Sequence, residues 1–130
     1  MSIISKAISL DHLVLTVKSI PASVTFYQRF LGMQHTVFTS KGTERHALLF
    51  GSQKINLHES GKEFEPKART VQPGSADLCF LVADDVADVA KRLHAANVEI
   101  LEGGKIVDRT GAVSKLKSVY IRDPDGNLIE

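Results

Sequence analysis

The sequence lacks several features that mark specialised classes of protein. It has no tryptophan, one cysteine and four prolines among 130 residues. A single cysteine cannot form an internal disulfide, which excludes a disulfide-stabilised scaffold and favours the reducing environment of the cytoplasm. No apolar stretch approaches the roughly 20 residues of a membrane span, and the first residues lack the apolar core and cleavage site of a signal peptide. We therefore expect a cytoplasmic protein without a membrane segment.

An excess of charge of either sign is also absent. Sixteen Lys and Arg against 15 Asp and Glu leave a net charge of +1. Because no basic cluster accompanies an aromatic platform, we expect no nucleic-acid partner. The hydrophobic fraction of 43% and the charged fraction of 24% are those of an ordinary globular protein. This length suits one compact domain, or two small halves that share a core.

The sequence does contain an internal repeat. Shifted by 65 positions, residues 12–17 fall on residues 77–82, and both runs are apolar, strand-like and begin with a potential metal ligand, His12 and Asp77. Helix-end signals keep the same offset, as N-cap or left-handed C-cap residues: Ser19 with Asp84, and Gly32 with Asn97. The repeat predicts two equivalent units whose opening residues are related by a pseudo-twofold axis.

Hydrophobic spacing predicts one helix in each half, directly after the opening strand. The predicted strands are 10–17, 34–39, 45–50 and 53–58 in the first half, and 77–82, 98–102, 117–122 and 127–130 in the second. The stretch 59–75, which contains two Pro and two Gly, is predicted to connect the halves. Residues 103–116 are predicted to form a long loop or an irregular hairpin. Each half is then strand, helix, strand, strand, strand, within an α+β fold.

Several side chains receive structural roles at this point. Cys79 alternates with Asp77 on its strand and is predicted to be a small core residue. Phe26 and Tyr27, near the end of the first helix, are predicted to pack in the core. The histidines without motif support, which are predicted to face solvent, are His35, His46 and His94.

Three motifs together carry a resemblance to a known family. They are Asp11-His12-Leu13-Val14, Phe26-Tyr27 with Phe30-Leu31-Gly32-Met33, and Asp123-Pro124-Asp125-Gly126-Asn127-Leu128-Ile129-Glu130. In a doubled βαβββ unit, these motifs resemble the vicinal oxygen chelate superfamily of glyoxalase I, fosfomycin-resistance proteins, extradiol dioxygenases and bleomycin-binding proteins. Within it, residues 54–59 and 62–67 are similar to the glyoxalase domain-containing protein 5 group. The resemblance covers essentially the whole chain.

The resemblance implies a single domain over residues 1–130, in which two paired βαβββ modules form a curled eight-stranded cup. Module 1 spans about 8–58, the linker 59–75 and module 2 about 76–130. Members of the superfamily are usually homodimers, and their modules pair either within a chain or across the dimer, so both arrangements stay open. Relatives continue for a few residues past the closing Glu, which leaves open a natural C-terminus beyond Glu130.

The resemblance also implies one divalent metal ion, Ni, Zn, Mn or Fe. Carried over by position, its ligands are His12 and Asp77 on the opening strands, and Asn56 and Glu130 on the closing strands. Glyoxalase I and the fosfomycin proteins usually have His where this chain has Asp77, and glyoxalase I has Glu or Gln in place of Asn56. Because Asn is a weaker neutral donor, His58, two residues along the same strand face, is the alternative ligand to Asn56.

These residues predict a glyoxalase I-like lyase or isomerase that acts on a small carbonyl or thiol-adduct substrate through a metal-stabilised enediolate, with Glu130 as catalytic base. One alternative is a metal-free binding protein of the bleomycin-resistance kind. Another is a ferrous extradiol dioxygenase, whose two histidines and one carboxylate would be His12, His58 and Glu130. The side chains that could attract an anionic small-molecule substrate are Arg45, Lys105 and Arg109.

Overall fold

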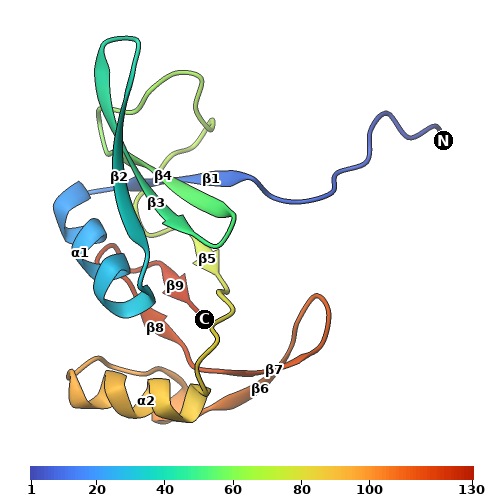
Figure 1. The fold of residues 1–130 in the computed structure, drawn as a ribbon, viewed down its shortest axis with the longest axis vertical. Helices are drawn as coiled ribbons and strands as arrows, with labels where there is room; N and C mark the ends of the chain where they lie inside the picture. The colour runs from blue at the N-terminus through green and yellow to red at the C-terminus, as the bar shows by residue number, and fades with distance from the viewer. The chain divides into compact units, whose positions relative to one another are not determined.

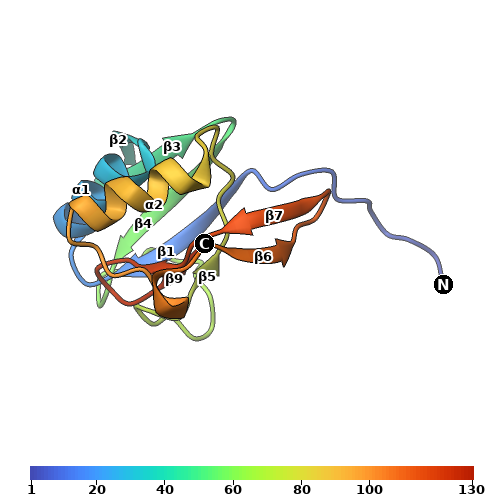
Figure 2. The same cartoon turned by 90° about the horizontal axis from the view of Figure 1, so that it is seen from below.

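The computed structural model describes all 130 residues, and they form two compact units, residues 1–71 and 72–130. Each unit combines one α-helix with short strands, which confirms the α+β class (Figures 1 and 2). The first eleven residues contain no strand or helix and lead away from the first strand in both views. None of the helices has the length and apolar character needed to cross a bilayer.

Unit 1 contains the elements β1 (His12–Val17), α1 (Ile20–Leu31), β2 (Gln34–Ser40), β3 (Thr43–Phe50) and β4 (Gln53–Glu59). Its four strands form one sheet in the order β1-β4-β3-β2. β1 runs parallel to β4, while β4 and β2 both run antiparallel to β3. The strand-helix-strand-strand-strand order predicted for the first half is therefore present, with β1 and β2 at the edges of the sheet.

The two ends of α1 follow the predicted capping signals. The Ser19 hydroxyl accepts a hydrogen bond from the Ala22 N–H at 3.2 Å, and Pro21 lies in the first turn, where its missing N–H costs no hydrogen bond. At the other end Gly32 adopts a left-handed conformation with φ 62°. Because a left-handed residue without a Cβ is unstrained, Gly32 ends the helix and turns the chain into β2.

One face of the unit 1 sheet is buried with α1, which packs against β2, β3 and β4. Leu15, Ile55 and Leu57 lie on this face and are at most 5% exposed. Phe26 and Tyr27 are buried as predicted, and their rings meet edge to face at 5.0 Å between centroids. Strand alternation therefore directs the intervening residues of β1 and β4 to the opposite face.

We call this opposite face of unit 1 the His12 face. It carries residues 12, 14 and 16 from β1 and residues 54, 56 and 58 from β4, which the parallel register pairs side by side. The antiparallel register adds Ala47, opposite Asn56, and then Arg45, two residues along β3 on the same face.

Unit 2 contains β5 (Asp77–Leu78), α2 (Val86–Ala95), a 3-10 turn at Glu102–Gly104, β6 (Val107–Thr110), β7 (Lys115–Ser118), β8 (Ile121–Arg122) and β9 (Leu128–Ile129). These strands form a three-stranded sheet in the order β5-β9-β8 and a separate β6-β7 hairpin. The chain therefore has nine strands, whereas eight were predicted.

The difference arises around residues 98–122: the strand predicted at 98–102 is absent, β6 is additional, and the strand predicted at 117–122 is divided between β7 and β8. Residues 98–102, predicted as a strand, are not one: the Leu101 N–H donates to the Tyr120 carbonyl at 2.8 Å, and no ladder forms. Positive φ angles of 57°, 67° and 77° at Glu102, Gly103 and Gly104 then turn the chain out of an extended path. The hairpin follows inside the stretch 103–116, where an irregular hairpin was one of the two predicted forms.

The start of α2 corrects one prediction of the repeat. The N-cap is Asp85, whose Oδ1 accepts from the Ala87 N–H at 3.0 Å, rather than Asp84. Asp84 instead forms an ion pair with Arg92 at 3.6 Å. At the other end the C-cap is Ala96, with φ −88°, and not Asn97. Asn97 follows it with φ 58°, close to the 62° of Gly32, so these two residues share the predicted left-handed conformation but not the C-cap position.

A closed set of hydrogen bonds holds the turn before β9. Asp123 Oδ1 accepts from the N–H groups of Asp125 and Asn127, both at 2.9 Å, and Asp123 Oδ2 accepts from the Asn127 side chain at 2.8 Å. The Asn127 amide oxygen in turn accepts from the N–H of Ala76 at 2.8 Å, although the two residues are 51 positions apart. Asn127 is 1% exposed. This part of the closing motif therefore stabilises unit 2 and joins the turn to the start of β5.

Candidate functional site

His12 is held in an orientation suited to metal binding. It opens β1 on the His12 face, with its side chain 45% exposed, and its Nδ1 lies 2.8 Å from Asp11 Oδ1. A carboxylate can only accept, so Nδ1 donates and Nε2 of the neutral ring keeps its lone pair free. Metal-binding histidines commonly donate their other N–H to a carboxylate in this way, because that bond fixes the ring and its tautomer.

Two further predicted ligands on the same face carry buried polar atoms without a partner. Asn56 Oδ1 and His58 Nδ1 are both inaccessible to solvent and make no hydrogen bond. Leaving a buried polar group unpaired costs about 1–3 kcal/mol. Atoms of this kind are suited to bind a ligand or an ion, so both alternatives predicted on β4 retain a free donor atom. These atoms are nitrogen and oxygen donors, which first-row divalent metals accept.

Neither unit by itself gathers three His, Cys, Asp or Glu side chains around one point. In unit 1, His12 is paired in register with Lys54, while His58 is paired with Thr16, four residues further along β1. Asn56 lies between the two histidines on the shared face. The donor types therefore fit a metal ion, although unit 1 supplies only part of a ligand set.

The environment of His58 favours its neutral form. His58 is 8% exposed, and burial, followed by the charge of Arg45, lowers the pKa of its ring below 6.5. Glu63 opposes these two effects, and Lys67 adds a smaller lowering. A neutral imidazole can bind a metal, whereas a protonated one cannot.

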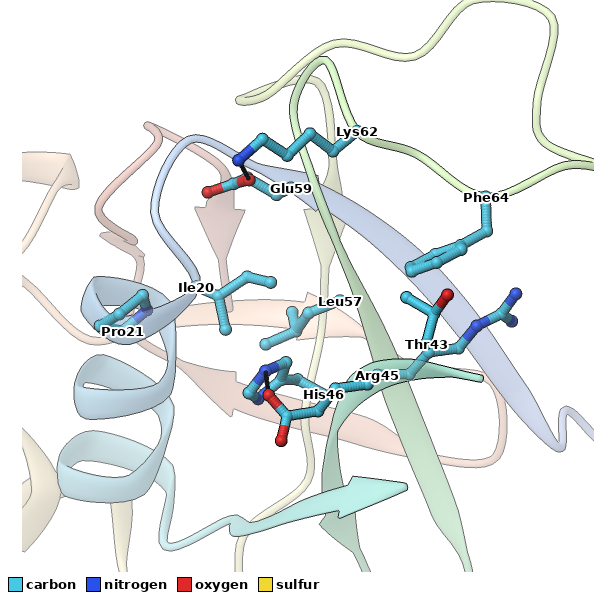
Figure 3. A pocket seen from close by; sticks show the side chains of 10 residues that line it. Ile20, Pro21, Thr43, Arg45, His46, Leu57, Glu59, Lys62 and Phe64 are labelled. Carbon is cyan, nitrogen blue, oxygen red and sulfur yellow. Dashed lines mark ion pairs between the residues drawn. The ribbon is translucent and has the colours of Figure 1, made fainter. Parts of the chain in front are cut away.

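A loop after β4 covers Arg45 with an aromatic ring. The Arg45 guanidinium lies 4.0 Å from the centroid of Phe64, and the Phe64 ring meets that of His58 at 5.3 Å and 71°. Arg45 makes no ion pair, and its buried Nε has no hydrogen-bond partner. Figure 3 shows Phe64 beside Arg45 and Thr43, with the guanidinium pointing away from Ile20 and Leu57.

Glu130 follows β9 in unit 2 and is half-buried. Its Oε2 accepts a hydrogen bond from the buried Ser118 hydroxyl at 2.7 Å. Its backbone extends the pairing with the opening strand, because the Glu130 N–H donates to the Leu78 carbonyl and the Phe80 N–H donates to the Glu130 carbonyl, both at 2.8 Å. Asp77 is exposed on that strand. Within unit 2, Glu130 makes no ion pair with a Lys or Arg.

Cys79 corrects a prediction, because its thiol is exposed rather than part of the core. Partial burial, the Glu130 carboxylate that accepts its hydrogen bond, and Asp77 together raise the pKa of Cys79 above its usual value. Pairing of Asp77 with Leu128 and of Leu78 with Ile129 places Cys79 beside Glu130 on the next step of the ladder. The strand alternation that links Cys79 to the polar Asp77 was the sequence signal for this position.

The remaining candidates for attracting an anion differ from Arg45. Arg109 is already occupied: its Nε donates to the Tyr120 hydroxyl at 2.9 Å and its Nη1 to the Asp108 carbonyl at 2.8 Å. Lys105 is exposed directly after the 3-10 turn. Among these three cations, Arg45 is therefore the one with a buried, unpaired donor.

Two histidines expected to face solvent are half-buried partners. His35 Nε2 lies 2.9 Å from His46 Nδ1, and their rings stack at 5.1 Å. They belong to β2 and β3, on the sheet face opposite His12, since His46 pairs with Leu57 and His35 with Leu48. His94 is exposed as predicted.

Sequence reasoning also missed the partners of the predicted residues. Asp11, Phe64 and Ser118 were not singled out, although each contacts a residue that was. Asp11 could have been found, because it directly precedes His12 and carboxylates often orient metal-binding imidazoles. Phe64 and Ser118 depend on loop and hairpin conformations for which the sequence has no local signal.

Comparison with known families shows to which protein superfamily the chain belongs. The family model described as "Glyoxalase/Bleomycin resistance protein/Dioxygenase superfamily" matches residues 9–130. The chain belongs to this superfamily. That membership confirms the resemblance read from the opening, helix-end and closing motifs.

Two curated members of the superfamily are similar along nearly the whole chain. The glyoxalase domain-containing protein RDO1 of Mycosarcoma maydis is 54% identical over 94% of this chain, which spans 66% of that protein's length. Virulence protein STM3117 of Salmonella typhimurium is 50% identical over 93% of this chain and 81% of its own length. The chain thus covers slightly less than two thirds of the first relative.

Solved structures agree with the superfamily fold. A protein from the mobile metagenome of V. Pseudocholerae has a TM-score of 0.89 at 50% identity, covering 98% of this chain and 95% of its own. Lactoylglutathione lyase from Agrobacterium tumefaciens has a TM-score of 0.68 at 20% identity, with 96% and 92% covered. TnmS3, an antibiotic binding protein from Streptomyces sp. CB03234, has 0.67 at 20% identity, with 96% and 95% covered. The last two likenesses show the fold alone.

Proposed function

We propose that this chain is a metal-dependent lyase or isomerase resembling glyoxalase I, acting on a small carbonyl or thiol-adduct substrate. His12 and Glu130 are the ligands that we assign to one divalent ion, Ni, Zn or Mn. Asp77 is a further donor, together with either His58 or Asn56. We place the protein in the cytoplasm, since a single cysteine suits a reducing compartment.

The observation that carries this proposal is the state of the His12 ring. Asp11 accepts from Nδ1 at 2.8 Å and thereby leaves Nε2 available. A surface histidine without a ligand has no need of this arrangement, whereas a metal-binding one gains a fixed tautomer and a more basic nitrogen. The unpaired Oδ1 of Asn56, on the same sheet face, is a second donor atom without a protein partner.

In the proposed reaction, the ion and the residues of the chain have different roles. A bound divalent ion supplies Lewis-acid stabilisation of negative charge on a substrate oxygen. Glu130 is the base that takes the proton from the neighbouring carbon, and the Ser118 hydroxyl, which donates to its Oε2, holds the carboxylate in position. Asn56 has a neutral amide and cannot share the role of base, so a single carboxylate carries the proton transfer.

Metal analysis of His12→Ala tests the proposal. We expect the parent protein, purified without added metal, to hold nickel, zinc or manganese by inductively coupled plasma mass spectrometry. His12→Ala should bind that ion more than about tenfold more weakly, because a direct ligand is lost. His94→Ala, an exposed histidine outside the predicted site, is the matched control and should keep the metal. Equal metal retention by His12→Ala and the parent would contradict the proposal.

The same measurement separates two other functions. A metal-free binding protein is favoured by the group formed by Arg45, Phe64 and His58, because its polar atoms can hold a ligand without a metal. TnmS3, which has this fold, is described as an antibiotic binding protein. Parent protein without metal would support this binding function. Bound iron would support a ferrous dioxygenase that uses His12, His58 and Glu130.

A further inference from the structure

Arg45 is a guanidinium without an acceptor, although the chain offers carboxylates nearby. Its Nε is buried without a hydrogen bond, and no Asp or Glu lies within ion-pair distance of any of its nitrogens. Glu63, on the adjacent loop, pairs with Lys67 at 3.2 Å and accepts from the Gly61 N–H. The partners of the Glu63 carboxylate therefore come from its own loop, and Arg45 has no ion-pair partner.

Phe64 holds the guanidinium without using its donors. The Arg45 carbon Cζ lies over the Phe64 ring, 4.0 Å from its centroid, in a cation–π contact. The N–H groups of arginine all lie in that plane and point outward along its edge. The contact with Phe64 thus restricts the side chain in advance, and the guanidinium keeps the fork of N–H groups that binds a carboxylate or phosphate through two parallel bonds.

The charges around Arg45 also favour an anion. Lys54 shares the His12 face and lies over the Phe38 ring at 4.9 Å, and Lys67 lies close enough to affect His58. Two acidic groups also lie on this side, Glu63 and Glu65, and both pair with Lys67, at 3.2 Å and 3.9 Å.

We propose that Arg45 binds an oxyanion, a carboxylate or a phosphate or phosphonate group, of the small molecule that this protein acts on. This inference rests on the proposed function, because Arg45 shares the His12 face with Asn56 and His58. It gives the substrate class a definite chemistry: a small molecule that bears an anionic oxygen group in addition to the reacting oxygens. Phe64 positions the guanidinium and makes no charged contact of its own.

The Arg45 Nε–H is the direct reporter for a test by 15N NMR. Protein stripped of metal on a chelating resin is titrated at constant ionic strength with benzoate, with inorganic phosphate, and with benzamide as the neutral isostere of benzoate. We expect a saturable shift of the Arg45 Nε–H with at least one of the two anions and none with benzamide. Whichever anion acts identifies the group as carboxylate or phosphate.

Arg29 is the matched comparison inside the same chain. Its Cζ also lies over a phenylalanine ring, 5.0 Å from the Phe30 centroid, but Arg29 is exposed in the last turn of α1. Arg29 should show no saturable shift. Arg45→Lys keeps the charge and loses the planar fork, so binding followed at the Phe64 amide should weaken about tenfold. Arg29→Lys should bind like the parent.

Three results would overturn the inference: no saturable shift with either anion, an equal shift at Arg29, or unchanged affinity in Arg45→Lys. The experiment is independent of the metal test, since it uses metal-free protein. If His12→Ala retains the metal, the proposed lyase function is contradicted, while the oxyanion site is not. If the metal test succeeds and no anion binds, the oxyanion site is wrong and the proposed lyase function is unaffected.

Discussion

His58 has an unusual position for a histidine, because it is buried beside cations. Burial, Arg45 and Lys67 lower its pKa below the 6.5 of a free imidazole. Between 6.5 and the lower folded value, the unfolded chain therefore binds a proton at this residue that the folded chain does not. Stability from this source is fully present above pH 6.5 and is lost as the pH falls through the folded pKa.

We therefore predict that replacing His58 flattens the acid side of the stability profile. His58→Asn removes the titrating ring, so its free energy of unfolding should fall less between about pH 7 and pH 5 than that of the parent. Urea unfolding at a series of pH values measures the difference. His94→Asn, which replaces an exposed histidine, should keep the parent slope, and an unchanged slope in His58→Asn would contradict the prediction.

Single residues could be predicted from sequence where strand alternation governs their side. Asn56 and His58 share a face because they are two positions apart on β4, and the structure confirms this. Cys79 was predicted in the core, whereas its alternation with the polar Asp77 on the same strand indicates the exposed position that the structure has. The contact between His35 and His46 depends on the register of two strands, for which there is no local signal.

At the scale of elements, the two helices follow directly from local chemistry. Apolar residues at spacings of three and four, with capping residues before and left-handed residues after, predicted α1 and α2 in the correct places. The start of α2 was predicted one residue too early, because Asp84 and Asp85 have equal capping ability. Which of them caps depends on the path by which the chain leaves β5.

The pair Asp84 and Asp85 gives a direct test of the cap. Asp85→Ala should lower the free energy of unfolding by about 1 kcal/mol, because the Ala87 N–H loses its acceptor. Asp84→Ala removes only an exposed ion pair with Arg92 and should cost less than about 0.5 kcal/mol. Urea denaturation followed by circular dichroism compares the two. If Asp84→Ala lowered the free energy of unfolding more than Asp85→Ala does, Asp85 would not be the N-cap.

The strands of unit 2 were harder to predict than its helix. The apolar residues of 98–102 resemble a strand, but a strand needs a neighbouring strand with which to form hydrogen bonds. Positive φ angles at Glu102, Gly103 and Gly104 turn the chain away from the extended path that such pairing requires. The turn before β9 was predicted correctly from Asp, Pro and Gly. The burial of Asn127, and its bond to Ala76 across 51 positions, could not be predicted locally.

For the whole molecule, we propose a homodimer. Both edge strands of the unit 1 sheet, β1 and β2, carry an exposed valine, Val14 and Val37, each 46% exposed. An open sheet edge with apolar side chains can pair with a second chain, and closed two-subunit assemblies are the commonest oligomers. Multi-angle light scattering over a dilution series at micromolar concentration should give twice the monomer mass of 14.2 kDa. A monomer mass throughout the series would contradict this proposal.

Assembly is also the scale at which sequence is least informative. The repeat with an offset of 65 residues identified two related units, because capping and strand signals recur. Whether two such units pair within one chain or between two is decided by surfaces that carry no periodic pattern. Superfamily membership establishes the fold, but both kinds of unit pairing are compatible with that fold.

The parallel pairings described for each unit have a consequence for protein synthesis. In unit 1, β1 pairs with β4, so that sheet can close once Glu59 has left the ribosome. In unit 2, β5 pairs with β9, and Ala76 is bonded to Asn127, so its first strand has no partner until its last has been translated. The emerging chain should therefore gain its structure in two stages. During the interval, the nascent β5 and α2 remain exposed to chaperones and proteases.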